Sequence, residues 1–227
     1  MDRKEFDKLV VDAVNDVDLK SSEIPAIDLY VDQIINLHTG KLKEGSERYN
    51  ERQLTKTMIN NYAKDRVITP VKGKKYSKEQ IVQILLIYAL KSTLSIGEIK
   101  RLLDGAYAID GFNSEALTSF YDKLCENKAW GRERSVEEVE KMLSAKGLDI
   151  EKDEDFLVAV ASLASMSAFL KNIAQAMIDE RYPEEKSESD SDKDKKEKEP
   201  KDKKEKDKKE PKEKKEKKKK KSADVGE

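Results

Sequence analysis

The stretch LTKTMINNYAKDRVITPVKGKKYSKEQIVQ, residues 54–83, combines a short helix, an exit segment, a basic turn and the start of a second helix. Thr55 can cap the first helix by accepting a hydrogen bond from a backbone amide, and the helix is expected to end near Lys64. The residues expected to face the core are Met58, Ile59 and Tyr62. The stretch therefore predicts a short helix with one polar face.

The polar face of this helix has side chains that suit nucleic acid. These residues are Lys56, Thr57, Asn60, Asn61 and Lys64. Asparagine can bond adenine at two points in the major groove, while lysine and threonine mostly position the DNA backbone. After the helix, Lys72, Lys74 and Lys75 surround Gly73, which favours a two-stranded ribbon pressed against phosphates. This pattern predicts contact with double-stranded DNA.

Charge is distributed unevenly along the 227 residues. The formal net charge is -5 over residues 1–47, +8 over 48–101, -7 over 102–182 and +3 over 183–227, which together give the overall -1. A basic segment between two acidic ones is typical of a local polyanion site, and it contains residues 54–83. The alternative is chance clustering of solvated lysines.

Helix signals dominate the rest of the sequence. The S-x-x-E/Q spacing of a capping box occurs at Ser77 with Gln80, Ser95 with Glu98, and Ser135 with Glu138. Gly105 and Gly147 are expected to end the helices that begin after Ser95 and Ser135. Further amphipathic helices are predicted over residues 3–17, 27–37, 55–64, around 117–124, and over about 153–181. No run of alternating β-branched residues occurs, so the domain is expected to be nearly all helical.

The stretch FLVAVASLASMSAFL, residues 156–170, is apolar and rich in small side chains. It is shorter than the roughly 20 apolar residues that cross a bilayer, so no membrane span is expected. We interpret it as a buried core helix, with a dimer seam as the alternative. Residues 183–227 repeat lysine and glutamate without apolar residues, which predicts a disordered tail.

The residues that serve catalysis or metal binding are scarce. One histidine, His38, and one cysteine, Cys125, leave no cysteine-clustered zinc site, and a nucleophile pair would require these two to meet. We therefore expect no enzyme, no metal and no cofactor. Cys125 is expected to be a half-buried hydrophobe and His38 a helix-end residue. Trp130 is expected to plug the core at a helix corner, with the anchoring of a partner as the alternative. The acidic N-terminus predicts a cytoplasmic protein without a signal peptide.

Several motifs together resemble a known family. The order MINNYAKDRVITP, KKYSKEQI and LSIGEIKRLL is similar to the DNA-binding domain of MerR-type regulators. IPAIDLYVDQI followed by LTKTMINNYAKD resembles more closely an uncharacterised, MerR-like domain of unknown function from Gram-positive bacteria, over roughly residues 24–180. The resemblance implies a mainly α fold: a MerR-like winged helix-turn-helix with a short β wing, then a helical C-terminal bundle.

The resemblance also implies roles for individual segments. Residues 27–37 would form the first helix of the helix-turn-helix, residues 55–64 the recognition helix and residues 71–76 the wing. The expected parts are 1–23, an N-terminal helix; 24–105, the winged helix-turn-helix; 106–182, a helical part for packing or dimerisation; and 183–227, the tail. The DNA-binding residues would be Thr55, Lys56, Thr57, Asn60, Asn61, Tyr62, Lys64, Lys72, Lys74, Lys75 and Tyr76, with Tyr62 and the wing lysines on phosphates.

These observations favour a sequence-specific transcriptional regulator that binds DNA as a homodimer and does not bind membranes. The alternative is a non-catalytic helical adaptor that keeps the winged-helix scaffold but binds protein, through the acidic half from 102 to 182. The discriminating feature is whether Lys56, Asn60, Lys64 and Lys74 share one exposed face of the fold; burial or divergence of any of them would favour the adaptor. No small-molecule effector is indicated by the sequence.

Overall fold

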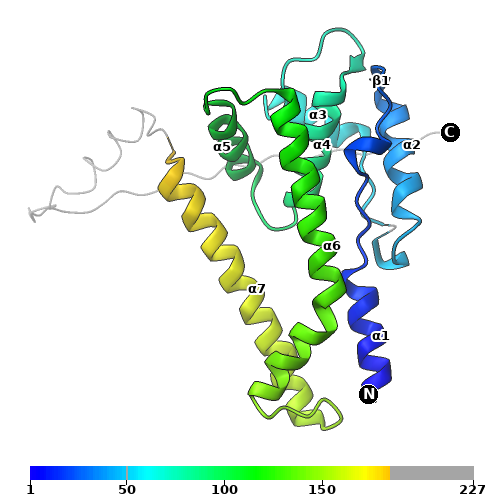
Figure 1. Ribbon diagram of the computed structural model, residues 1–227, viewed down its shortest axis with the longest axis vertical. Helices are drawn as coiled ribbons and strands as arrows, with labels where there is room; N and C mark the ends of the chain where they lie inside the picture. Colours follow the sequence, from blue (N-terminus) through cyan, green and yellow to red (C-terminus); the bar gives the residue numbers. More distant parts are fainter. Residues whose placement is uncertain (50, 185–227) are drawn as a thin grey trace, which may run out of the picture. The chain divides into compact units, whose positions relative to one another are not determined.

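The computed structural model describes residues 1–49 and 51–184 (Figure 1). This part of the chain is mainly helical, as the sequence predicts. Its elements are α1 (Arg3–Val14), η1 (Ser21–Glu23), β1 (Leu29–Tyr30), α2 (Val31–Leu42), η2 (Glu47–Tyr49), α3 (Lys56–Lys64), β2 (Lys75–Tyr76), α4 (Lys78–Leu90), α5 (Ile96–Tyr107), α6 (Ser114–Ala145) and α7 (Asp153–Arg181). The tail expectation concerns residues that, except for 183 and 184, lie outside the described part.

Helix α4 lies at the centre of the main hydrophobic core. It begins with the predicted capping box, in which the Ser77 amide donates to Gln80 Oε1 at 2.9 Å and the Gln80 amide donates to Ser77 Oγ at 3.4 Å. Every residue from Gln80 to Ile87 is buried. Because this helix is covered on all sides, it fixes the positions of the helices and loops that contact it.

Helix α5 also begins with its predicted capping box, formed by Ser95 and Glu98. The expected stop at Gly105 is wrong, because the helix continues to Tyr107. A Cβ added at Gly105 would overlap the Tyr182 ring. Glycine is therefore required here for the close approach of Tyr182, the residue that follows α7, and not for a left-handed cap.

The only β structure in the described residues is one short antiparallel pair. Leu29 is opposite Tyr76, and Tyr30 is opposite Lys75. The ribbon predicted within residues 71–76 is therefore wrong in its pairing, because its second strand comes from the segment before α2. The helix predicted over residues 27–37 therefore begins later, as α2 over Val31–Leu42, and Ile27 is exposed.

Helix α6 is continuous across a region that the sequence divides into two helices. The predicted capping box at Ser135 is wrong, since Ser135 lies inside the helix and its hydroxyl donates to the Arg132 carbonyl at 2.8 Å. Trp130 is 62% exposed with Arg134 over its ring, so it does not plug the core. The predicted end is confirmed, because Gly147 follows the helix with φ 66°.

Helix α7 has the predicted bounds but not the predicted environment. Figure 1 shows it diverging from α6 and ending near α5, and only Ala159 and Ile178 along its length are buried. The interpretation as a buried core helix is therefore wrong. By length and composition this 29-residue helix could cross a membrane, so a short uncharged run does not exclude a span here.

A second, smaller hydrophobic cluster joins α1, the end of α6 and the start of α7. Its buried members are Phe6, Val10, Leu143, Ile150 and Ala159. At the other end of α7, Ile178 belongs to the main core and Arg101 Nη2 lies 2.7 Å from Asp179 Oδ1. Both ends of α7 are thus attached to the same unit, residues Met1–Glu184.

Candidate nucleic-acid interface

Helix α3 begins where the sequence predicts. Thr55 is its N-cap, and the Thr55 hydroxyl accepts a hydrogen bond from the Met58 amide at 3.2 Å. Ile59 is fully buried and Met58 is partly buried, so the expected core face is confirmed. The helix ends near Arg66, which adopts a left-handed φ of 55° while the Val67 amide donates to the Tyr62 carbonyl.

The outer face of α3 is polar and solvent-exposed. All of its predicted members, Lys56, Thr57, Asn60, Asn61 and Lys64, are exposed. Lys56, Asn60 and Lys64 follow one another at intervals of four residues, so they form one row along the helix. Among the described residues, neither lysine forms an ion pair. Their donors are available to an external anion.

A second set of exposed cations follows in the chain. Lys72, Lys74 and Lys75 are exposed around a turn in which Gly73 has φ 78°. The Lys75 ammonium lies 5.2 Å from the centroid of the Tyr30 ring, a cation–π contact that holds the start of β2 against β1. Lys74, the fourth residue named above as discriminating, is exposed as well, but it lies on this turn and not on α3.

The two tyrosines assigned to this interface are buried. Tyr62 is 5% exposed and Tyr76 is 7% exposed, and burial raises the pKa of both phenols. Tyr62 faces the core from α3, and Tyr76 packs there from β2. Their assignment to DNA contact is therefore corrected, because a side chain with so little exposed surface has a structural role here.

Two glutamines of α4 hold the segment between α3 and β2. Gln83 is 1% exposed, and its Oε1 accepts hydrogen bonds from the Thr69 amide at 2.9 Å and the Thr69 hydroxyl at 3.2 Å. Its Nε2 donates to the Tyr107 hydroxyl, which donates in turn to Glu79. A buried amide satisfied in this way fixes the loop to the core.

Gln80 completes this attachment. Its Nε2 donates to the carbonyl oxygens of Thr69 at 3.2 Å and Pro70 at 2.9 Å. The sequence pattern marks Gln80 only as a capping residue and gives no role to Gln83. The available signal was Gln83 inside the apolar run from Ile81 to Ile87 and Gln80 directly before it, since polar groups at core positions need partners.

The position of the lone histidine differs from the one expected from the sequence. His38 lies inside α2, 4% exposed, with its ring 4.3 Å from that of Tyr88 in an edge-on arrangement. Burial, followed by the charge of Lys91, lowers the pKa of His38 to about 4. The expected helix-end position is therefore wrong, and the imidazole is neutral at pH 7.

The lone cysteine is a buried thiol. Cys125 is 6% exposed on α6, and burial raises the pKa of its thiol. A protonated, covered thiol is a poor nucleophile, which supports its interpretation as a small hydrophobe. Within residues 1–49 and 51–184, no group of three or more histidine, cysteine or acidic residues is placed to hold a metal ion.

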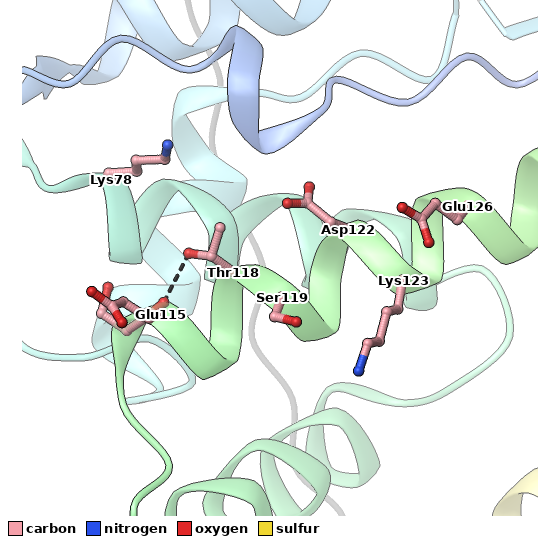
Figure 2. Close-up of a pocket in the computed structure, with 8 residues that line it drawn as sticks. Lys78, Glu115, Thr118, Ser119, Asp122, Lys123 and Glu126 are labelled. Atoms are coloured by element: carbon pink, nitrogen blue, oxygen red, sulfur yellow. Dashed lines mark hydrogen bonds between the residues drawn. The ribbon is translucent and has the colours of Figure 1, made fainter.

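An acid-lined hollow on α6 is the second candidate site. Its volume is about 560 Å³, and Figure 2 shows Lys78 of α4 beside a row of α6 side chains that includes Glu115, Asp122 and Glu126. Asp122 already accepts hydrogen bonds from the Ser21 amide and hydroxyl, at 3.2 and 2.6 Å. One carboxylate is thereby committed to joining η1 to α6, and the others face solvent.

Comparison with known protein families finds a match that covers the candidate interface. Residues 19–124 match the family model described as Domain of unknown function (DUF1836). The match confirms the expected domain of unknown function, over a shorter range than the predicted 24–180. It runs from just before η1 into α6 and so includes the whole candidate interface, but not α7. No curated protein and no solved structure matches the chain.

Proposed function

We propose that this chain is a sequence-specific DNA-binding transcriptional regulator in which α3 enters the major groove. The observation that carries the proposal is the exposed row of Lys56, Asn60 and Lys64, free of ion pairs with the described residues. In this arrangement Asn60 and Asn61 read base edges, and the lysines contact phosphates. The DNA is bound as a double strand in a MerR-like manner.

The lysines of the turn after α3 extend the proposed contact. Lys72 and Lys74 project from the loop that Gln80 and Gln83 attach to the core. A loop held in this way can place cations against phosphates flanking the groove, in the manner of a wing. The loop provides affinity, whereas the asparagines of α3 provide sequence preference.

The proposed regulator acts as a homodimer on two half-sites. A two-fold symmetric protein binds a two-fold symmetric operator with each α3 in a successive major groove. This arrangement doubles the number of base contacts without enlarging the single recognition helix. The proposed site of action is the cytoplasm, on the nucleoid.

Replacing Asn60 or Asn61 by alanine tests base reading. Each change should weaken binding to a selected duplex by about 1 to 3 kcal/mol and leave binding to random DNA nearly unchanged. Fluorescence anisotropy with both duplexes measures this difference. Asn127→Ala, at an exposed asparagine of α6, is the matched control and should alter neither affinity. Equal losses on both duplexes would remove α3 from base recognition.

The alternative function is a non-catalytic adaptor that binds protein through the acidic half of the chain. The hollow lined by Glu115 and Glu126 is the feature that favours it, because its carboxylates would attract a basic segment. Capture of a basic peptide by the full chain at physiological salt, lost in Glu115→Gln with Glu126→Gln and unaffected by Asn60→Ala, would favour the adaptor over the regulator.

A further inference from the structure

Helix α7 exposes more large apolar side chains than any other helix in the described residues. Ten of them are more than a third exposed: Phe156, Leu157, Val158, Val160, Leu163, Met166, Phe169, Leu170, Ile173 and Met177. Leu170 is 61% exposed and Met177 is 67% exposed. Contiguous apolar exposure of this kind marks an interaction surface, since isolated exposed residues do not form a row.

The exposed residues follow the spacing of a coiled-coil seam. Counting from Phe156, apolar residues recur at alternating intervals of three and four. These positions, called here the α7 seam, are Phe156, Ala159, Leu163, Met166, Leu170, Ile173 and Met177. Six of the seven are exposed, and Ala159 alone is covered by the smaller hydrophobic cluster. A three-four repeat over three heptads is the pattern by which one helix pairs with another.

We propose that the α7 seam pairs antiparallel with the α7 seam of a second copy of this chain. In this pairing Leu163 of one copy lies in a layer with Ile173 of the other, and Met166 lies with Leu170. The pairing gives the proposed regulator its two-fold axis. It is nevertheless independent of the proposed function, because self-association is measured without DNA.

The residues that flank the seam favour a second copy over a different partner. Flanking positions normally carry charges that select one partner and reject others. Between Phe156 and Met177 none of them is charged; they are Val160, Ser162, Ser167, Phe169, Ala174 and Ala176. The charged Asp155 flanks only the first seam residue. Two identical seams therefore meet without like-charge repulsion, and the small side chains allow the helices to approach closely.

The ends of α7 favour the antiparallel orientation. Its first turn contains Asp153, Glu154 and Asp155, and its last turn contains Arg181. A parallel pair would bring the two acidic turns together. An antiparallel pair places each acidic turn at the level of the other copy's Arg181 and also opposes the two helix dipoles, which is the favourable arrangement.

The attachments of α7 argue against a membrane as the occupant. Ala159 and Ile178, near its two ends, lie in clusters that α6 also joins, through Leu143 and Leu117. The helix between them rises by about 28 Å, close to the thickness of a bilayer core. A spanning α7 would therefore draw the middle of α6 into the bilayer with the charges of Lys128 and Arg132, which is costly.

Size-exclusion chromatography with light scattering on the full chain tests the pairing. The wild type should be a dimer. Leu170→Glu places two carboxylates in the seam and should raise the dimer dissociation constant by about 100-fold or more. Leu157→Glu is the matched control: this leucine is 68% exposed on the same helix but lies outside the seam, so its variant should remain a dimer. Circular dichroism verifies that both variants are folded.

Cysteine cross-linking tests the orientation and does not depend on the behaviour of the glutamate variant. The native Cys125 is buried and provides an uncross-linked background. A mixture of Leu163→Cys and Ile173→Cys chains should form a disulfide dimer, whereas each variant alone should not. Cross-linking of each variant with itself would establish a parallel pair and overturn the proposed orientation.

Three results would overturn the pairing itself. A monomeric wild type would do so, as would equal dimerisation of Leu170→Glu and Leu157→Glu. The third result would be flotation of the wild type with phosphatidylcholine and phosphatidylglycerol vesicles that is lost in Leu170→Glu, because the seam would then face lipid. A wild type that dimerises but does not bind DNA would contradict the proposed function and leave the pairing of α7 standing.

Discussion

Helices α4 and α7 are both rich in apolar residues, yet they lie in opposite environments. Residues Gln80–Ile87 of α4 are all buried, whereas α7 buries only Ala159 and Ile178. The core around α4 supports the polar face of α3, while α7 presents apolar surface to solvent. The contrast shows that composition alone does not separate a helix that completes a core from one that is exposed to solvent.

The largest expected difference between the two helices is in stability. Ile84→Ala should lower the free energy of unfolding by about 2 to 5 kcal/mol, because this fully buried side chain leaves a cavity in α4. Leu157→Ala on α7 should change it by less than about 0.5 kcal/mol, since that side chain is exposed. Urea unfolding of both variants measures the two values, and similar losses would contradict the contrast.

The pH dependence of stability tests the packing around α4, because His38 of α2 contacts Tyr88 of α4. The unfolded chain protonates His38 near its ordinary pKa of 6.5, whereas the folded chain does so only near 4, so protons favour unfolding in this interval. The free energy of unfolding should fall by up to about 3 kcal/mol as pH drops from 6.5 to 4. His38→Phe should flatten the upper part of this slope, because the chain has no other histidine. An unchanged slope would mean that the imidazole titrates normally.

The smallest expected effect concerns the backbone beside the proposed interface. Arg66 has φ 55° and Gly73 has φ 78°, a conformation that glycine adopts without strain. Arg66→Gly should raise the free energy of unfolding by about 0.5 to 1 kcal/mol, and Gly73→Ala should lower it by a similar amount. Nothing crowds a Cβ at Gly73, so this pair isolates backbone strain. Thermal denaturation would contradict the geometry if both changes had the same sign.

Local signals in the sequence predicted helix starts well when one turn determined the outcome. The caps at Thr55, Ser77 and Ser95 form as predicted, because each needs only groups within three residues. The same spacing at Ser135 failed, since α6 continues through it and satisfies the backbone without a cap. The pairing of β1 with β2 joins segments 45 residues apart, and no local pattern specifies such a partner.

The candidate site was predicted in part. The outward positions of Asn60 and Lys64 followed from helical periodicity, whereas Tyr62 and Tyr76 were assigned by resemblance and are buried. Gln83 was missed, because its role depends on Thr69 and Tyr107 being brought to it by tertiary structure. The environment of α7 was missed for the same reason, since neighbours cannot be read from composition.

The most direct test of the proposed function is selection of bound sequences from random duplex DNA by the full chain at raised salt, with the Asn60→Ala, Asn61→Ala double variant in parallel. The salt suppresses nonspecific attraction to the lysine-rich tail. Enrichment of a two-fold symmetric motif by the wild type, lost in the double variant, is the predicted result. Absence of any enriched motif, or the same motif from both proteins, would contradict base recognition by α3.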